Sequence, residues 1–200
     1  MLDGVSIISE ADVNVRVARR VRDLRARRGL SLGALAARSG VSRSMISLVE
    51  RGEASPTAVV LEKLAVGLDV TLASLFEVPV DAAPAGPLAR AADQPAWRDP
   101  ASGYLRRNVS PVGHPTPVQI VDVEFPAGGR VAYEAGGRET LVQQQVWVLA
   151  GEVEVTVGAD THRLGAGDCL AHDLDRPVMF HNPGDVPARY AVVLHGQARR

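Results

Sequence analysis

The sequence predicts two domains of different class, an all-helical domain followed by an antiparallel β domain. Over residues 13–76, apolar side chains recur at steps of three and four residues, the spacing of amphipathic helices. From residue 104 onward, segments rich in β-branched residues alternate with Gly, Pro, Asp and Asn clusters, which is typical of a sandwich or barrel. Residues 79–100 contain prolines among many alanines and show neither the helical nor the strand periodicity of apolar residues. We therefore predict a helical domain at 1–78, a linker at 79–100 and a β domain at 101–200.

Five short helices are expected in the first domain. The first has an apolar stripe between residues 13 and 24. Ser31 and Ser42 stand where the second and third helices need N-caps, and Thr57 stands at the start of the fourth. The segment 71–76 is expected to close the domain with a last helical turn.

The β domain should consist of short strands separated by tight turns. We expect the segments 170–172 and 178–180 to form a hairpin, which would place His172 opposite Val178. Four further strands are expected at residues 119–125, 146–149, 153–157 and 189–194.

Composition excludes several classes of protein. No run of eighteen apolar residues occurs and no basic segment precedes an apolar stretch at the start, so we expect neither a membrane span nor a signal peptide, and a cytoplasmic protein. The single cysteine, Cys169, permits no internal disulfide and no thiolate metal cluster. We expect Cys169 to be a small buried side chain in a strand.

Charge is distributed unevenly along the chain. Residues 13–52 contain ten arginines against only Asp23 and Glu50, a net charge of +8, whereas the whole chain carries −1. Such a local excess is typical of a surface that binds phosphates. We therefore expect double-stranded DNA as a partner of the helical domain.

The third predicted helix has side chains suited to reading bases. In two helices joined by a short turn, early residues of the second helix reach base edges in the major groove. Arg43 can pair with guanine, Ser44 and Ser47 are short and adaptable, and Leu48 can meet a thymine methyl group. The alternative is that Arg43 and Ser44 only solubilise a surface helix.

Segments 31–42 and 46–52 resemble the lambda-repressor-like (XRE) helix-turn-helix family. The resemblance implies that Arg25 pairs with Glu50 for structural reasons. It departs from the family at Leu32, where a phosphate-binding glutamine is common. The DNA-binding residues expected on this basis are Ser31, Ser42, Arg43, Ser44, Ser47, Leu48 and Arg51.

Segments 125–129, 146–157 and 164–185 resemble a cupin, a small β-barrel (double-stranded β-helix) with a ligand cavity. Metal-binding cupins use a His-x-His pair, a glutamate and a late histidine. Here these positions fall in 136–140, at Gln144 and at Val178, which cannot replace imidazoles and a carboxylate. The resemblance therefore implies a cupin without metal or other cofactor.

The cavity is expected to bind an uncharged or weakly polar organic effector, because apolar walls would surround a few polar groups. His172 either donates a hydrogen bond to that effector or is a satisfied core histidine. The alternative for the whole barrel is that it is filled by its own side chains and serves only to dimerise. The residues expected to bind the effector are Val131, Tyr133, Gln144, Val146, His172, Val178 and Phe180.

These features together predict a homodimeric DNA-binding transcriptional regulator whose β domain senses a small molecule. Trp147 is a candidate for the dimer interface, although burial within one subunit would explain it equally well. The alternative, from the enzyme class, is a metal-dependent cupin oxygenase or epoxidase with an appended helix-turn-helix domain. A third reading is a DNA-binding antitoxin with a protein partner.

Overall fold

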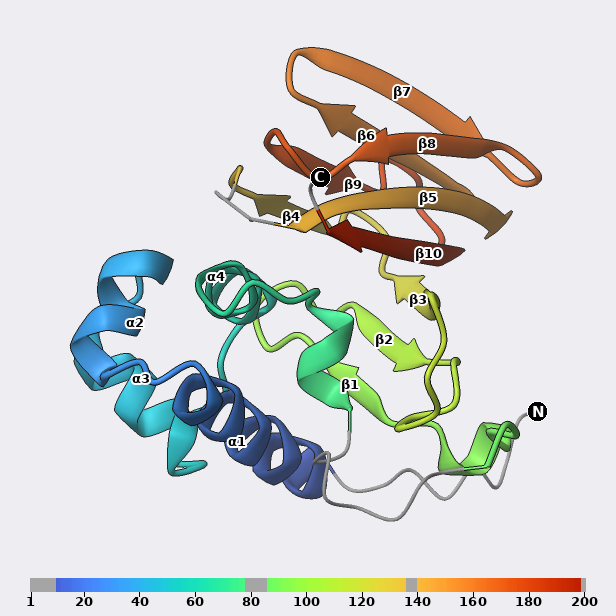
Figure 1. Cartoon of the computed structure of the whole chain (residues 1–200). Coiled ribbons are helices and arrows are strands. Elements are labelled where there is room, and N and C mark those ends of the chain that lie inside the picture. Colours follow the sequence, from blue (N-terminus) through green and yellow to red (C-terminus); the bar gives the residue numbers. More distant parts are fainter. Residues whose placement is uncertain (1–9, 78–85, 136–139, 199–200) are drawn as a thin grey trace.

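The computed structural model describes residues 10–77, 86–135 and 140–198. Figure 1 shows the α-helices on one side of the molecule and most of the strands on the other, with α4 and the turn η1 next to the strands. The helices are α1 (Glu10–Arg27), α2 (Leu32–Ser39), α3 (Arg43–Glu50) and α4 (Ala58–Gly67), with 3-10 turns η1 (Ala73–Phe76) and η2 (Ala91–Asp93). The strands are β1 (Ala96–Arg98), β2 (Leu105–Asn108), β3 (Val118–Phe125), β4 (Arg130–Tyr133), β5 (Thr140–Ala150), β6 (Glu152–Val157), β7 (Asp160–Gly165), β8 (Cys169–Asp173), β9 (Val178–His181) and β10 (Ala188–Ala198).

The predicted helix starts are confirmed. The Ser31 hydroxyl accepts a hydrogen bond from the Ala34 N–H at 3.0 Å, and Ser42 accepts one from the Met45 N–H at 3.2 Å. These caps satisfy backbone donors that have no partner inside the helix. The apolar stripe of α1 is buried as expected, and its members are Val13, Val17, Val21 and Leu24.

The prediction of a fifth α-helix is wrong for the described residues, which contain four α-helices and the short 3-10 turn η1 in its place. Thr71 explains the tight turn, because its hydroxyl accepts a hydrogen bond from the Ser74 N–H at 3.1 Å. The turn has only four residues before the backbone becomes extended at Glu77, which leaves no room for an α-helical ladder.

Part of the predicted linker is a strand. β1 pairs antiparallel with β2, and Trp97 at its centre is buried against Phe76 and Tyr104, at ring-centroid distances of 5.7 and 6.1 Å. A buried aromatic side chain thus anchors this part of the Pro- and Ala-rich segment. The domain boundaries themselves stay predictions.

The β domain consists of two antiparallel sheets that face each other. One has the strand order β1-β2-β3-β10-β5-β8, and the other has the order β4-β9-β6-β7. The sheets pack through aromatic side chains, with Phe180 of β9 stacked on Tyr190 of β10 at 5.7 Å. The cupin architecture is therefore present, but the prediction of a closed barrel is wrong, because no hydrogen-bonded ladder joins the two sheets in the described residues.

The predicted hairpin between 170–172 and 178–180 is also wrong. β8 pairs with β5, which places His172 opposite Gln144, whereas β9 pairs with β4 and β6 in the other sheet. The segment between β8 and β9 therefore crosses from one sheet to the other. Gly151 makes the same kind of crossing between β5 and β6 with φ 72°, and a Cβ there would lie 2.9 Å from the Ala188 Cα.

Two further sequence expectations have clear outcomes. Cys169 is exposed, not buried, at the start of β8. In the part of the chain that the structure describes, no helix is both long enough and apolar enough to cross a bilayer.

Candidate functional site

The third helix presents a short polar face to solvent. Arg43 and Ser44 are exposed in its first turn, while Ser47 and Leu48 are half-buried. Ile46 and Val49 point into the core with exposed fractions of 0% and 2%. The Ser42 and Ser44 hydroxyls lie 3.1 Å apart at the start of the helix. The residues expected to read bases therefore share one accessible face, with Arg43 as its only cation.

The expected phosphate contacts are Arg51 and Ser31, and the two side chains differ in the hydrogen bonds that they make. Arg51 donates hydrogen bonds to the Ser47 hydroxyl and to the exposed Glu53 carboxylate, the latter at 2.8 Å. Exposed pairs of this kind contribute little, so a DNA phosphate can replace Glu53 at small cost. Ser31 is exposed, and its hydroxyl proton is free to donate because the oxygen already accepts from Ala34.

Arg25 and Glu50 form the structural pair implied by the family resemblance. The guanidinium donates to both carboxylate oxygens at 2.6 and 2.8 Å and to the Leu30 carbonyl at 2.9 Å. This bidentate ion pair is strong because both partners are charged and mostly shielded from water. It fixes the end of α3 against α1, and with it the orientation of the polar face.

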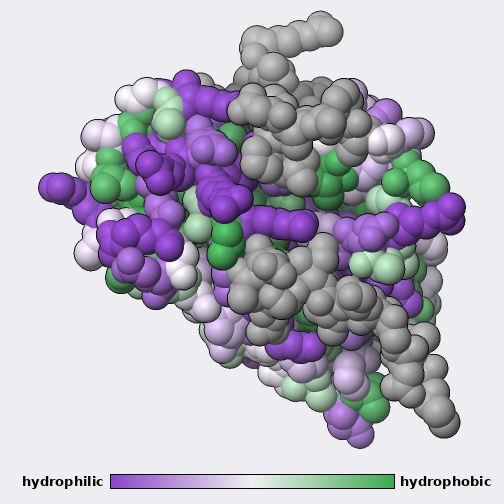
Figure 2. Space-filling model, turned by 90° about the horizontal axis from the view of Figure 1, so that it is seen from below, coloured by the Kyte–Doolittle hydropathy of each residue, from purple (hydrophilic) through white to green (hydrophobic). Residues whose placement is uncertain are grey.

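The cationic surface is smaller than the net charge of residues 13–52 indicates. Arg20 is 6% exposed and pairs with Glu77 at 2.9 Å, and Arg25 is held by Glu50, so neither is available to a phosphate. Figure 2 shows hydrophilic side chains gathered at the left of the face seen from below, on the side of the helices in Figure 1. The exposed arginines of this segment are Arg19, Arg22, Arg27, Arg28, Arg38, Arg43 and Arg51.

A cavity of about 80 Å³ lies between the two sheets and reaches the helical domain. Its walls come from β strands of both sheets, from Thr71 and Leu72 just before η1, and from Glu62 of α4. Several water molecules fit in this volume, so it admits a small organic molecule. Residues of the helical domain and of the β domain therefore both contribute to the cavity wall.

Five of the seven residues expected to bind an effector line this cavity. They are Val131, Tyr133, Gln144, Val178 and Phe180. Val146 is fully buried in the core, and His172 lines another pocket with Asp173 and with Arg176, which borders both pockets. The sequence placed His172 in the cavity because it assumed the hairpin that the fold does not contain.

Three buried polar residues of the cavity wall were not expected from the sequence. Tyr104 precedes β2, Arg106 lies within it and Tyr190 lies on β10; their exposed fractions are 4%, 5% and 4%. The only signal available was the alternation in β2, where Arg106 and Asn108 take the inward positions. An inward arginine in a four-residue strand is easily read as an exposed edge residue.

The tyrosine hydroxyls of the cavity stay protonated. Burial raises the pKa of Tyr104 and raises those of Tyr133 and Tyr190 well above the usual value, although the nearby Arg106 charge acts in the opposite direction on all three. The Tyr104 and Tyr133 hydroxyls lie 3.1 Å apart and share a hydrogen bond. These groups therefore act as neutral hydrogen-bond donors.

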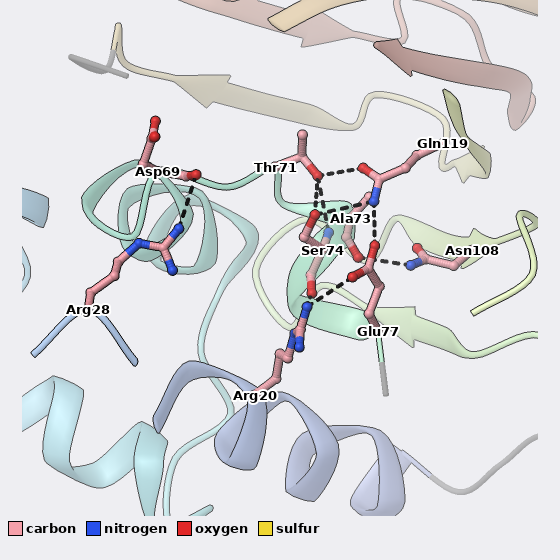
Figure 3. Close-up of polar contacts among 9 residues, drawn as sticks. All are labelled: Arg20, Arg28, Asp69, Thr71, Ala73, Ser74, Glu77, Asn108 and Gln119. Carbon is pink, nitrogen blue, oxygen red and sulfur yellow. Dashed lines mark hydrogen bonds and ion pairs between the residues drawn. The ribbon is translucent and has the colours of Figure 1, made fainter. Parts of the chain in front are cut away.

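The two domains are joined by polar contacts beside the cavity (Figure 3). Gln119 of β3 accepts a hydrogen bond from the Thr71 hydroxyl at 2.6 Å and donates to Glu77 at 2.5 Å. Asn108 of β2 donates to the Ala73 carbonyl at 3.0 Å. These contacts tie β2 and β3 to η1 and its flanking residues, and η1 packs on α1.

Potential metal ligands are dispersed in the described residues, where no three His, Cys, Asp or Glu side chains come together as a metal site. Gln144 and Val178, at two of the usual cupin ligand positions, lie on the cavity wall. Residues 136–139, most of the expected His-x-His region, lie outside the described residues.

Comparison with known proteins identifies both domains. A helix-turn-helix family model matches residues 21–75, and a cupin domain model matches residues 123–194. The HTH-type transcriptional regulator SutR of Escherichia coli (strain K12) is 25% identical over 175 residues, which are 88% of this chain and 92% of that protein. The HTH-type transcriptional regulator SlrR of Bacillus subtilis (strain 168) is 40% identical over 62 residues, 30% of this chain and 41% of that protein.

A solved structure has the same fold over nearly the whole length. The crystal structure of an HTH_3 family transcriptional regulator from Vibrio cholerae superposes with a TM-score of 0.73 and 22% identity, covering 94% of this chain and 98% of that one. The two family matches, in this order along the chain, agree with the regulators it resembles. The chain belongs to the XRE-type helix-turn-helix transcriptional regulators that carry a C-terminal cupin domain.

Proposed function

We propose that this protein binds operator DNA through α3 and that a small organic effector in the interdomain cavity controls this binding. The observation that carries the proposal is the shared cavity wall: Thr71 and Leu72 of the helical domain face the same space as the cupin strands. A ligand can alter DNA affinity only if it interacts differently with two arrangements of the protein. Because both domains bound the cavity, a ligand in it would interact differently with two arrangements of these domains.

On the DNA side, Arg43, Ser44, Ser47 and Leu48 would contact base edges, while Ser31, Ser42 and Arg51 would position the helix on the phosphates. The exposed cap of α2 and the exposed Arg51 side chain support this division. A homodimer would place two copies of α3 in successive major grooves. Trp147, half exposed on the outer face of β5, is the candidate contact between subunits.

The proposed cupin works without a metal and is not an enzyme. Gln144 and Val178 stand at positions where metal-binding cupins need a carboxylate and an imidazole, and neither side chain replaces those ligands. Both cavity positions instead suit an organic ligand. Metal analysis of the purified protein tests this point, since stoichiometric iron would favour the oxygenase reading.

Enrichment of genomic fragments by the purified full chain tests the DNA-binding proposal. We expect the enriched fragments to share a sequence with two-fold symmetry. Binding to such a fragment should weaken by at least about tenfold between 50 and 200 mM salt, because counterions are released when phosphates are neutralised. Failure to retain any duplex fragment at low salt would exclude the proposal.

A further inference from the structure

Arg106 is a buried cation that no side chain of the described residues neutralises. Within the described residues, its Nε–H has no hydrogen-bond acceptor and no carboxylate pairs with its guanidinium, although the residue is only 5% exposed. Its guanidinium group lies over the Phe76 ring, whose centroid is 4.8 Å from the guanidinium carbon. Buried charges in proteins are normally paired, so an unpaired one facing a cavity indicates a missing anion.

Two acidic residues, Glu62 and Glu134, also line the cavity. Glu134 has a side chain that is 75% exposed and forms an ion pair with Lys63 at 3.0 Å. Glu62 is partly exposed on α4 and already has another interaction partner. The second cation of the wall, Arg176, is exposed and pairs with Asp175 at 3.0 Å. Among the described residues that line the cavity, Arg106 is therefore the buried formal charge.

Neutral donors line the same cavity. The hydroxyls of Tyr104, Tyr133 and Tyr190 belong to the cavity wall, and Gln144 adds an amide. The Tyr190 hydroxyl has no hydrogen-bond partner among the described residues, and Tyr104 can turn its hydroxyl from Tyr133 to a ligand. A guanidinium with hydroxyl and amide donors is the arrangement that binds an oxyanion.

The rest of the wall is aliphatic or aromatic. Val121, Val123, Val131, Val178 and Leu194 face the space that remains beyond the polar groups. Together with a volume of about 80 Å³, this sets the shape of the occupant. We propose that the effector is a small amphiphilic anion, with a carboxylate or similar oxyanion held by Arg106 and a short apolar body held by the valines.

This inference rests on the proposed function and replaces the uncharged effector expected from the sequence. It also explains how a ligand in the cavity affects the helical domain. Arg106 contacts Phe76 of η1, so an anion that draws the guanidinium toward itself changes a contact between the two domains. Arg106 is thus both the ligand-binding group and the link to the DNA-binding part.

Thermal unfolding of the full chain with matched charged and neutral probes tests the inference. The probes are acetate, propionate and butyrate, each compared with its amide, with inorganic phosphate and sulfate as other oxyanions and potassium chloride as the salt control. We expect at least one anion to raise the melting temperature by roughly 3–5 °C at ten times its dissociation constant, and the matching amide to have no effect.

Substitution of Arg106 separates specific binding from a general salt effect. Arg106→Met should abolish the anion-dependent rise, Arg106→Lys should retain part of it, and Arg130→Met, an exposed arginine on β4, should leave it unchanged. Because Arg106→Met removes an unpaired buried charge, we expect the unliganded variant to melt no lower than the parent protein.

The alternative results are distinguishable. A rise caused equally by acids and amides would overturn the anion inference and leave the effector proposal intact. An anion effect that persists in Arg106→Met would show binding elsewhere and would also overturn it. If neither these probes nor a wider set of neutral small molecules changes the melting temperature, both the inference and the effector proposal fail.

Discussion

The Asp99 carboxylate accepts a hydrogen bond of 2.9 Å from the backbone N–H of Ala58, so a residue beside the β domain caps the first turn of α4. The same side chain accepts hydrogen bonds from the Ser102 N–H and hydroxyl at 2.9 and 2.5 Å. Asp99 is 2% exposed, so these contacts are shielded from solvent. The carboxylate thus ties the DNA-binding domain to the turn that leads into β2.

Asp99→Ala should lower the free energy of unfolding by about 1–3 kcal/mol, because it leaves the Ala58 and Ser102 donors buried without an acceptor. Urea denaturation measures the change. Asp93→Ala, an exposed aspartate of η2, is the control and should change stability by less than about 0.5 kcal/mol. Equal stability of the two variants would show that the cap does not join the domains energetically.

Arg43→Ala should weaken operator binding by about 1–3 kcal/mol and relax base preference at one position, since Arg43 is the cation on the base-reading face. Fluorescence anisotropy with a set of single-base operator variants measures both effects. Arg163→Ala, on β7 and paired with Glu152, is the matched control. If Arg43→Ala reduced affinity for every operator variant equally, Arg43 would be a phosphate contact.

Arg51→Ala should weaken binding to all sequences alike and make it less dependent on salt, because a phosphate contact contributes charge without base information. The slope of log affinity against log salt should fall in magnitude by about one. A change of base preference in this variant would contradict the assigned role.

Arg25→Ala should destabilise the helical domain by about 2–3 kcal/mol, somewhat less than for a fully buried pair, since it strands the Glu50 carboxylate in a shielded site. Arg25→Ala combined with Glu50→Gln should recover part of the loss, because the second change removes the stranded charge. Chemical denaturation of Arg25→Ala, Glu50→Gln and the double variant gives the comparison. Additive losses in the double variant would mean that the pair contributes nothing as a pair.

Local features of the helical domain were predictable from sequence because short-range physics determines them. Caps at Ser31 and Ser42 and the inward positions of Ile46 and Val49 follow from residue type and helical spacing alone. The fifth helix failed for an equally local reason, since the Thr71 side chain closes a 3-10 turn.

The cavity was predictable only in part, because strand pairing over long sequence distances determines its wall. Tyr133, Gln144 and Phe180 follow from the resemblance to cupins and from inward alternation. Arg106 was missed because its cavity position depends on the pairing of the short strand β2 with β3, and Thr71 because its cavity position depends on docking of the two domains. The predicted position of His172 in the cavity was wrong because β8 pairs with β5 and not with β9.

Stability should decrease as the pH falls below about 6.5, the ordinary pKa of histidine, because burial lowers the pKa of His172 in the folded protein. Its Nδ1 lies 3.1 Å from the Asp173 carbonyl, and its buried Nε2 has no partner in the described residues. The unfolded chain therefore binds the proton first, and the loss is complete below the folded pKa. His172→Gln should flatten this part of the curve of unfolding free energy against pH.

Glu77 should act in the opposite direction at lower pH. Burial is the main cause that raises its pKa, against the attraction of Arg20, so the folded protein holds the proton more tightly than the unfolded chain. Its contribution is fully present below the ordinary carboxyl pKa of 4.5 and is lost as the pH rises through the folded value. Glu77→Gln should remove that dependence, and an unchanged profile would contradict the assignment.

Control of DNA binding by the cavity is tested most directly by anisotropy titration of an enriched operator fragment with the full chain, with and without the anion that raises its melting temperature. We predict that the saturating anion changes the dissociation constant for DNA at least about fivefold in the parent protein, and leaves it unchanged in Arg106→Met. An equal change in both proteins, or no change in the parent protein, would contradict control of DNA binding from the interdomain cavity.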